Sequence, residues 1–137
     1  MLKIFIASHA HFASGMKSAI ELLAGEKDNI VCFDAYVNEN DIDKAINQFL
    51  AATNKNDQIV MISDLYGGSV NQMMCKYTLI PNVTLISGAN LALLLELSVR
   101  DSITSEELAK IVENSKSMIR VVNDELNSDK TNTADFF

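Results

Sequence analysis

The 137-residue sequence has few of the features that mark metal-binding, secreted or membrane proteins. Its two cysteines, Cys32 and Cys75, lie in separate apolar runs without metal-ligand spacing, so we expect two small buried hydrophobes in a reducing compartment. Residues 1–7 carry one lysine and too short an apolar run for a signal peptide. The most apolar stretch, Leu91–Leu97, is interrupted by Glu96 and is too short to span a bilayer. We therefore expect a cytoplasmic protein.

Basic residues are also scarce. The chain has 11 lysines and arginines against 18 aspartates and glutamates, which gives a formal net charge of −7. Binding to nucleic acid or to an anionic membrane requires a basic patch, so both are disfavoured as partners, whereas a basic protein partner is permitted. The hydrophobic content of 48% and the charged content of 21% are ordinary for a folded soluble protein, and the length suits one domain.

Short apolar runs alternate with amphipathic segments along the chain, which predicts strands and helices in turn. Asn40, Ser69 and Thr104 stand where helix N-caps are expected, and Glu107 completes a capping box with Thr104. The expected strands are 3–7, 29–36, 58–63 and 83–87, and the expected helices are 15–24, 41–50, 70–77, 91–100 and 105–115.

Four strands separated by helices predict right-handed βαβ units, and hence an α/β fold with a doubly wound, mostly parallel sheet. The simplest strand order is the flavodoxin-like order 2-1-3-4, whose switch point between strands 1 and 3 is where open α/β sheets bind ligands. We expect one domain over residues 1–122, in which 118–122 either prolong the last helix or add a fifth edge strand. Residues 123–137 are expected to be a polar, frayed tail.

The loops at this switch point carry a histidine and an aspartate. His9 follows the first strand and Asp64 follows the third, and neighbouring strands lie about 4.8 Å apart. An aspartate that accepts a hydrogen bond from Nδ1 of the ring leaves the Nε2 lone pair pointing outward. An imidazole held in this way serves as a nucleophile, a general base or a metal ligand.

The other motifs of common active sites are missing. Apart from this pair, the two loops offer only His11 as a metal ligand, and the sequence has no G-x-S-x-G elbow, no Walker lysine and no G-x-G-x-x-G run. We therefore expect no metal and no cofactor. His11 is expected to be a solvated or helix-start residue. The acidic patch after the second strand is expected to be a solvated edge, and its members are Asp34, Glu39, Asp41 and Asp43.

These loops do suit a phosphate group. Helix N-termini and glycine backbone N–H groups can approach an anion closely, and hydroxyl and amide groups add neutral donors. No lysine or arginine occurs in residues 8–16, 64–71 or 87–91, so the phosphate would be held loosely, which favours a relay over a kinase or phosphatase. The expected phosphate-binding residues are Gly67, Gly68, Ser69, Ser87 and Asn90.

Three segments in this order and spacing resemble the EIIA domain of the mannose family of the bacterial phosphoenolpyruvate-dependent sugar phosphotransferase system. They are IASHAHFASGM at 6–16, DLYGGSVN at 64–71 and SGANLALLLE at 87–96. The resemblance extends over about residues 1–122. Two positions depart from the family, because Ala10 stands where glycine is usual and Val70 where proline is frequent. Both departures affect the loop geometry more than the chemistry.

The resemblance implies a phosphotransferase component that works through a phosphohistidine. His9 matches the histidine that phospho-HPr phosphorylates, and Asp64 matches the aspartate beside it. The phosphoryl group would pass to an EIIB partner and then to sugar entering through the membrane permease complex. The resemblance also implies a homodimer, formed in some members by exchange of a C-terminal strand.

Two other functions remain open from the residues themselves. One is a flavodoxin-like binding module or sensor for a small anion or mononucleotide at the same crevice. The other is a stand-alone hydrolase that uses His9 as its base. The first would require tight binding by the unmodified protein, and the second would require turnover without protein partners.

Overall fold

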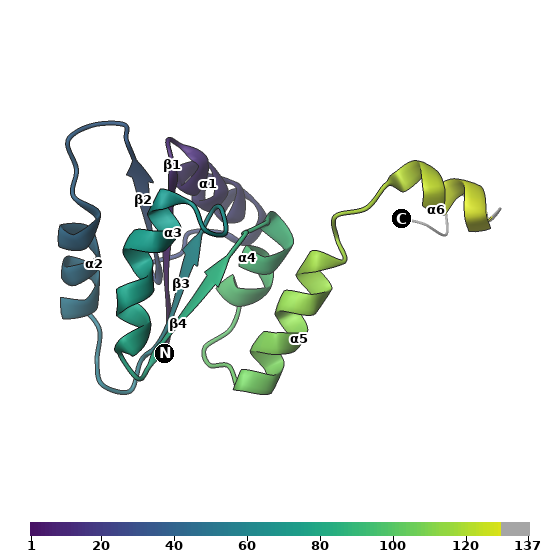
Figure 1. Cartoon of the computed structure of the whole chain (residues 1–137). Coiled ribbons are helices and arrows are strands. Elements are labelled where there is room, and N and C mark those ends of the chain that lie inside the picture. Colours follow the sequence, from purple (N-terminus) through teal and green to yellow (C-terminus); the bar gives the residue numbers. More distant parts are fainter. Residues whose placement is uncertain (130–137) are drawn as a thin grey trace.

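The four apolar runs form one parallel sheet in the computed structural model, which describes residues 1–129 (Figure 1). The strands are β1 (Leu2–His9), β2 (Ile30–Ala35), β3 (Gln58–Ser63) and β4 (Val83–Ser87). Their order is β2-β1-β3-β4, and every neighbouring pair is parallel. This confirms the predicted fold class and strand order.

Helices cover both faces of the sheet, and each face has its own core. α1 (Phe12–Ala24), α4 (Leu91–Ser98) and α5 (Ser105–Lys116) pack on one face. α2 (Ile42–Ala51), α3 (Ser69–Met74) and the 3-10 helix η1 (Cys75–Leu79) pack on the other. Because the central strands β1 and β3 are buried on both faces, their sequences are nearly continuous in apolar residues rather than alternating.

The helix starts agree with the prediction in one case out of three. Thr104 and Glu107 form the predicted capping box of α5. Asn40 was a wrong prediction, because Asp41 is the N-cap of α2 and accepts a hydrogen bond from the Asp43 backbone N–H at 2.9 Å. The prediction of Ser69 as a cap was also wrong, because Gly68 is the N-cap of α3. Ser69 is the first helical residue, and its hydroxyl contacts His9.

The chain after α5 differs from both structures that were predicted for it. Residues 118–121 neither prolong α5 nor join the sheet, so β4 is an edge strand of the described part of the chain. A further helix, α6 (Val122–Asp129), begins at the last residue of the predicted domain, covers 123–129 of the segment predicted as a frayed tail, and stands away from the body (Figure 1). The rest of that segment, 130–137, lies outside the described residues. The exposed apolar side chains of this region are Met118, Ile119, Val121, Val122 and Leu126.

The structure also bears on the expected burial of the two cysteines and on the expected lack of a membrane-spanning segment. Cys32 is half-buried against the core, but Cys75 is exposed on η1, where its Sγ donates to the Asn71 carbonyl at 3.2 Å. The expectation of a buried Cys75 was therefore wrong. Within residues 1–129, none of the helices has the length and apolar character needed to cross a membrane.

Candidate functional site

The adjacent strands β1 and β3 bring His9 and Asp64 into contact, as their positions predicted. Ala7 is in register with Ser63, so the last residue of β1 lies beside the first residue after β3. The His9 ring Nδ1 is 2.8 Å from Asp64 Oδ2, and the His9 backbone N–H donates to the same oxygen at 2.9 Å. One carboxylate oxygen therefore holds both the backbone and the ring of His9.

This contact determines the chemical state of the ring. Burial raises the pKa of the Asp64 carboxyl, but the hydrogen bonds from the His9 backbone and ring lower it by more, so the pKa lies below its ordinary value of 3.8. Asp64 is thus an anion at neutral pH and accepts the Nδ1 proton. The side chain of Asp64 is 13% exposed and that of His9 is 43% exposed, so the ring remains accessible, with its Nε2 lone pair on the side away from Asp64.

Two hydroxyl groups lie on the Nε2 side of the ring. Ser69 Oγ is 3.3 Å from His9 Nε2, and the Tyr36 hydroxyl is 2.6 Å from Ser69 Oγ. The Tyr36 ring lies against the imidazole, with centroids 5.5 Å apart and planes inclined by 41°. Sequence reasoning included Ser69 but missed Tyr36, whose only signal was an aromatic residue at the end of the strand beside the first.

The two predicted phosphate-binding glycines shape the loop that carries Ser69. Gly67 has a φ of +76°, a backbone conformation that favours glycine. Its N–H donates to Asn71 Oδ1 at 3.1 Å, and the Gly68 N–H donates to the Leu65 carbonyl at 3.0 Å. Both N–H groups are therefore used within the loop, and their binding to phosphate stays a prediction.

Ser87 and Asn90 form their hydrogen bonds with groups other than the His9 ring. Ser87 Oγ accepts from Ser63 Oγ at 3.0 Å and lines a cavity of about 280 Å³ with Lys116, a cation that loop spacing alone did not reveal. Asn90 is the N-cap of α4, and its Nδ2 donates to the Ser115 carbonyl at 2.7 Å. Asn90, unlike Ser87, lines the cavity of about 740 Å³ that His9 also lines. Their role toward phosphate stays a prediction.

The second histidine has a carboxylate partner of its own. His11 Nδ1 is 3.1 Å from Asp34 Oδ2, and Asp34 also accepts from the backbone N–H and the hydroxyl of Ser14, at 3.0 and 2.6 Å. Asp34 therefore ties β2 to the first turn of α1, and the prediction of a merely solvated carboxylate was wrong. His11 is 74% exposed and is the residue before α1, in agreement with its expected position.

Within residues 1–129, no three histidine, cysteine, aspartate or glutamate side chains gather as a metal ion would require. The fold and the site together define a doubly wound α/β protein in which Asp64 orients a histidine, His9, at the switch point of the sheet. A family model described as the phosphotransferase system fructose IIA component, EIIA-man, matches residues 3–115. The chain belongs to this family and is a component of a sugar phosphotransferase system. None of the curated proteins matches the chain.

Solved structures agree with this assignment. A Klebsiella pneumoniae protein described as a permease of the phosphoenolpyruvate-dependent sugar phosphotransferase system is 28% identical, with a TM-score of 0.81 over 91% of this chain and 93% of that one. A IIA protein associated with the fucose utilization operon of Streptococcus pneumoniae is 27% identical, with a TM-score of 0.76 over 91% and 96%. The EIIA component from Streptococcus agalactiae, at 24% identity, has a similar fold, with a TM-score of 0.75 over 90% and 98%.

The lowered pKa of Asp64 predicts how this residue affects stability. A carboxyl whose pKa falls on folding stabilises the protein above its unfolded pKa, and this contribution disappears as the pH falls through the folded pKa. We expect Asp64→Asn to lower the free energy of unfolding at pH 7 by about 1–3 kcal/mol. The difference from wild type should narrow below about pH 4, as measured by urea unfolding at a series of pH values. Asp28→Asn, at an exposed position, is the control, and a pH-independent difference for Asp64→Asn would contradict the assignment.

Proposed function

We propose that His9 accepts a phosphoryl group from phospho-HPr and passes it to an EIIB partner, which serves a membrane sugar permease complex. The observation that carries this proposal is the hydrogen bond of 2.8 Å from His9 Nδ1 to Asp64, which leaves Nε2 as the free nucleophile. Membership of the EIIA family supports the choice of partners. The reaction class is protein-to-protein phosphoryl transfer through a phosphohistidine.

The transfer step requires no proton to leave His9. The Nε2 lone pair attacks phosphorus on the donor, the donor's bond to phosphorus breaks, and that electron pair stays on the donor. The new bond makes the His9 ring cationic, and Asp64 balances this charge through the Nδ1 proton that it already accepts. Transfer onward is the same step, with a nucleophile of EIIB attacking phosphorus and the electron pair returning to Nε2.

The surroundings of Nε2 favour a relay over a one-way enzyme. The neutral hydroxyl of Ser69 is the group that contacts Nε2, and the loops at residues 8–16, 64–71 and 87–91 contain no lysine or arginine. Kinases and phosphatases use fixed cations to neutralise the charge of the transferring group. A phosphoryl group held by neutral donors is bound loosely, so transfer in either direction stays accessible.

The identity of the phosphorylated residue is the first test. Incubation with phosphoenolpyruvate, enzyme I and HPr should add one acid-labile phosphoryl group, detected by intact mass. His9→Ala should abolish this addition, because it removes the oriented nucleophile, and His11→Ala should retain it. The reverse result would overturn the assignment of His9. Tight anion or nucleotide binding without phosphorylation would favour a sensor, and turnover without partners would favour a hydrolase.

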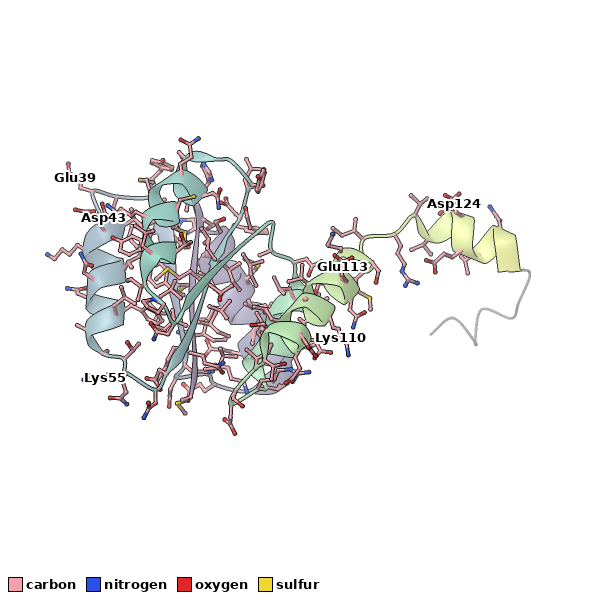
Figure 2. All side chains as sticks on the ribbon, turned by 60° about the horizontal axis from the view of Figure 1, so that its bottom comes forward. Glu39, Asp43, Lys55, Lys110, Glu113 and Asp124 are labelled. Carbon is pink, nitrogen blue, oxygen red and sulfur yellow. The ribbon has the colours of Figure 1, made fainter. Side chains whose placement is uncertain are left out.

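The acidic edge before α2 provides a test of partner docking. Glu39 is exposed and extends from the surface there (Figure 2), whereas Asp41 caps α2 and is unsuitable for substitution. We expect transfer from phospho-HPr to slow as salt is added, and Glu39→Lys to lower the association rate about two- to fivefold at low salt. Glu26→Lys, at an exposed position before β2 and so at the other end of that strand, is the matched control. If both variants associate with phospho-HPr at the same rate, and salt does not change that rate, charge does not guide docking and the shape of the surface selects the partner.

We also propose that the protein is a homodimer. A groove of about 550 Å³ runs between the edge strand β4 and α5, and the segment after α5 exposes the apolar side chains of Met118, Ile119, Val121 and Val122. An uncovered strand edge beside apolar side chains favours association. Sedimentation at micromolar concentration should give a dimer, and Ile119→Asp should shift it toward monomer, whereas Lys110→Asp on the outer face of α5 should not. A clean wild-type monomer would contradict the proposal.

A further inference from the structure

Tyr36 has a backbone conformation that its residue type disfavours. Its φ is +67°, in the left-handed region, where a non-glycine residue is strained. The side chain is 64% exposed, so burial of the aromatic ring offsets little of this cost. Strain of this kind persists where the surrounding contacts require the conformation, and it concentrates at functional sites. The contacts of Tyr36 therefore need an explanation.

The position of Tyr36 connects it to the site from the side opposite Asp64. Tyr36 follows Ala35, the residue of β2 that is in register with His9, and the Ala10 backbone N–H donates to the Ala35 carbonyl at 2.8 Å. From this position the Tyr36 ring contacts the imidazole and its hydroxyl reaches Ser69 at the start of α3. The side chain thus links β2 to both the nucleophile and its neighbouring hydroxyl.

The directions of the hydrogen bonds that run from His9 through Ser69 to Tyr36 follow from Asp64. The Nδ1 proton is donated to the Asp64 carboxylate, so Nε2 is an acceptor only, and the Ser69 hydroxyl must donate to it. A hydroxyl has one proton, so at the contact of 2.6 Å with Tyr36 the Ser69 oxygen is the acceptor and the tyrosine is the donor. Donation by Tyr36 also polarises Ser69 and makes its hydroxyl a stronger donor.

We infer that Tyr36 is a positioning residue for phosphoryl transfer, which acts by directing the Ser69 hydroxyl. This inference rests on the proposed function of His9. Once Nε2 bonds to phosphorus its lone pair is used, so the Ser69 proton turns to a phosphoryl oxygen. Tyr36 continues to donate to the Ser69 oxygen in both states, so the single Ser69 proton is not donated to the tyrosine and stays directed at Nε2 or at the phosphoryl oxygen. No proton is transferred, and only the acceptor of one hydrogen bond changes.

The experiment compares Tyr36→Phe, Ser69→Ala and the double variant in single-turnover transfer from phospho-HPr. Tyr36→Phe keeps the ring and removes the hydroxyl, so the maximal rate should fall about three- to tenfold while the half-saturating donor concentration stays unchanged. Because Tyr36 acts through Ser69, the double variant should be no slower than Ser69→Ala alone. Tyr66→Phe, which removes a phenol hydroxyl from the neighbouring exposed loop, is the control.

A measurement on the unphosphorylated protein separates this inference from the proposed function. In ¹⁵N NMR spectra, Tyr36→Phe should move the His9 Nε2 resonance in the same direction as Ser69→Ala, and Tyr66→Phe should leave it unchanged. A wild-type protein that takes no phosphate would refute the proposed function. The inference itself is overturned if the Nε2 resonance does not respond to Tyr36→Phe, if that variant transfers at the wild-type rate, or if the two single losses multiply in the double variant.

Discussion

One carboxylate oxygen organises the whole site. Asp64 Oδ2 accepts from the backbone N–H of His9 at 2.9 Å and from its ring at 2.8 Å. The first bond holds the end of β1 against the loop after β3, and the second selects the tautomer of the imidazole. A single residue thereby couples the sheet edge to the tautomer of the His9 ring. The directions of the hydrogen bonds through Ser69 and Tyr36 follow from that choice, because Nε2 is left with an acceptor role only.

The same edge of the sheet contains the strained backbone of the described chain. Ala10 and Tyr36 are its non-glycine residues with positive φ, at +48° and +67°, and each directly follows one of the neighbouring strands β1 and β2. The resemblance led us to expect glycine at the position of Ala10, and the left-handed φ of this residue is a conformation that glycine adopts at less cost. Backbone strain on both sides of the His9 side chain is typical of a site that trades some stability for orientation.

Much of the fold and the central pair were accessible to sequence reasoning. Apolar runs separated by amphipathic segments predicted the four parallel strands, and their order placed His9 and Asp64 at one edge. Local competition among adjacent polar residues was less predictable. Asn40 and Asp41 are both good caps, and the aspartate caps α2 because its side chain reaches the N–H of Asp43. Asp34 looked like a surface charge but receives three hydrogen bonds from α1 and His11.

The sequence by itself determined the class of protein, because hydrophobic periodicity and the polar loops after strands 1 and 3 are properties of contiguous residues. Only the tertiary structure decided what surrounds Nε2. Tyr36, Ser69 and His9 come from three separate elements, and their contacts depend on strand register and on a left-handed turn that no local pattern specifies. The structure of the chain after α5 could not be decided from the sequence for a related reason. Residues 118–122 are mostly apolar and suit either a prolonged helix or an edge strand, and local propensity alone does not choose between the two.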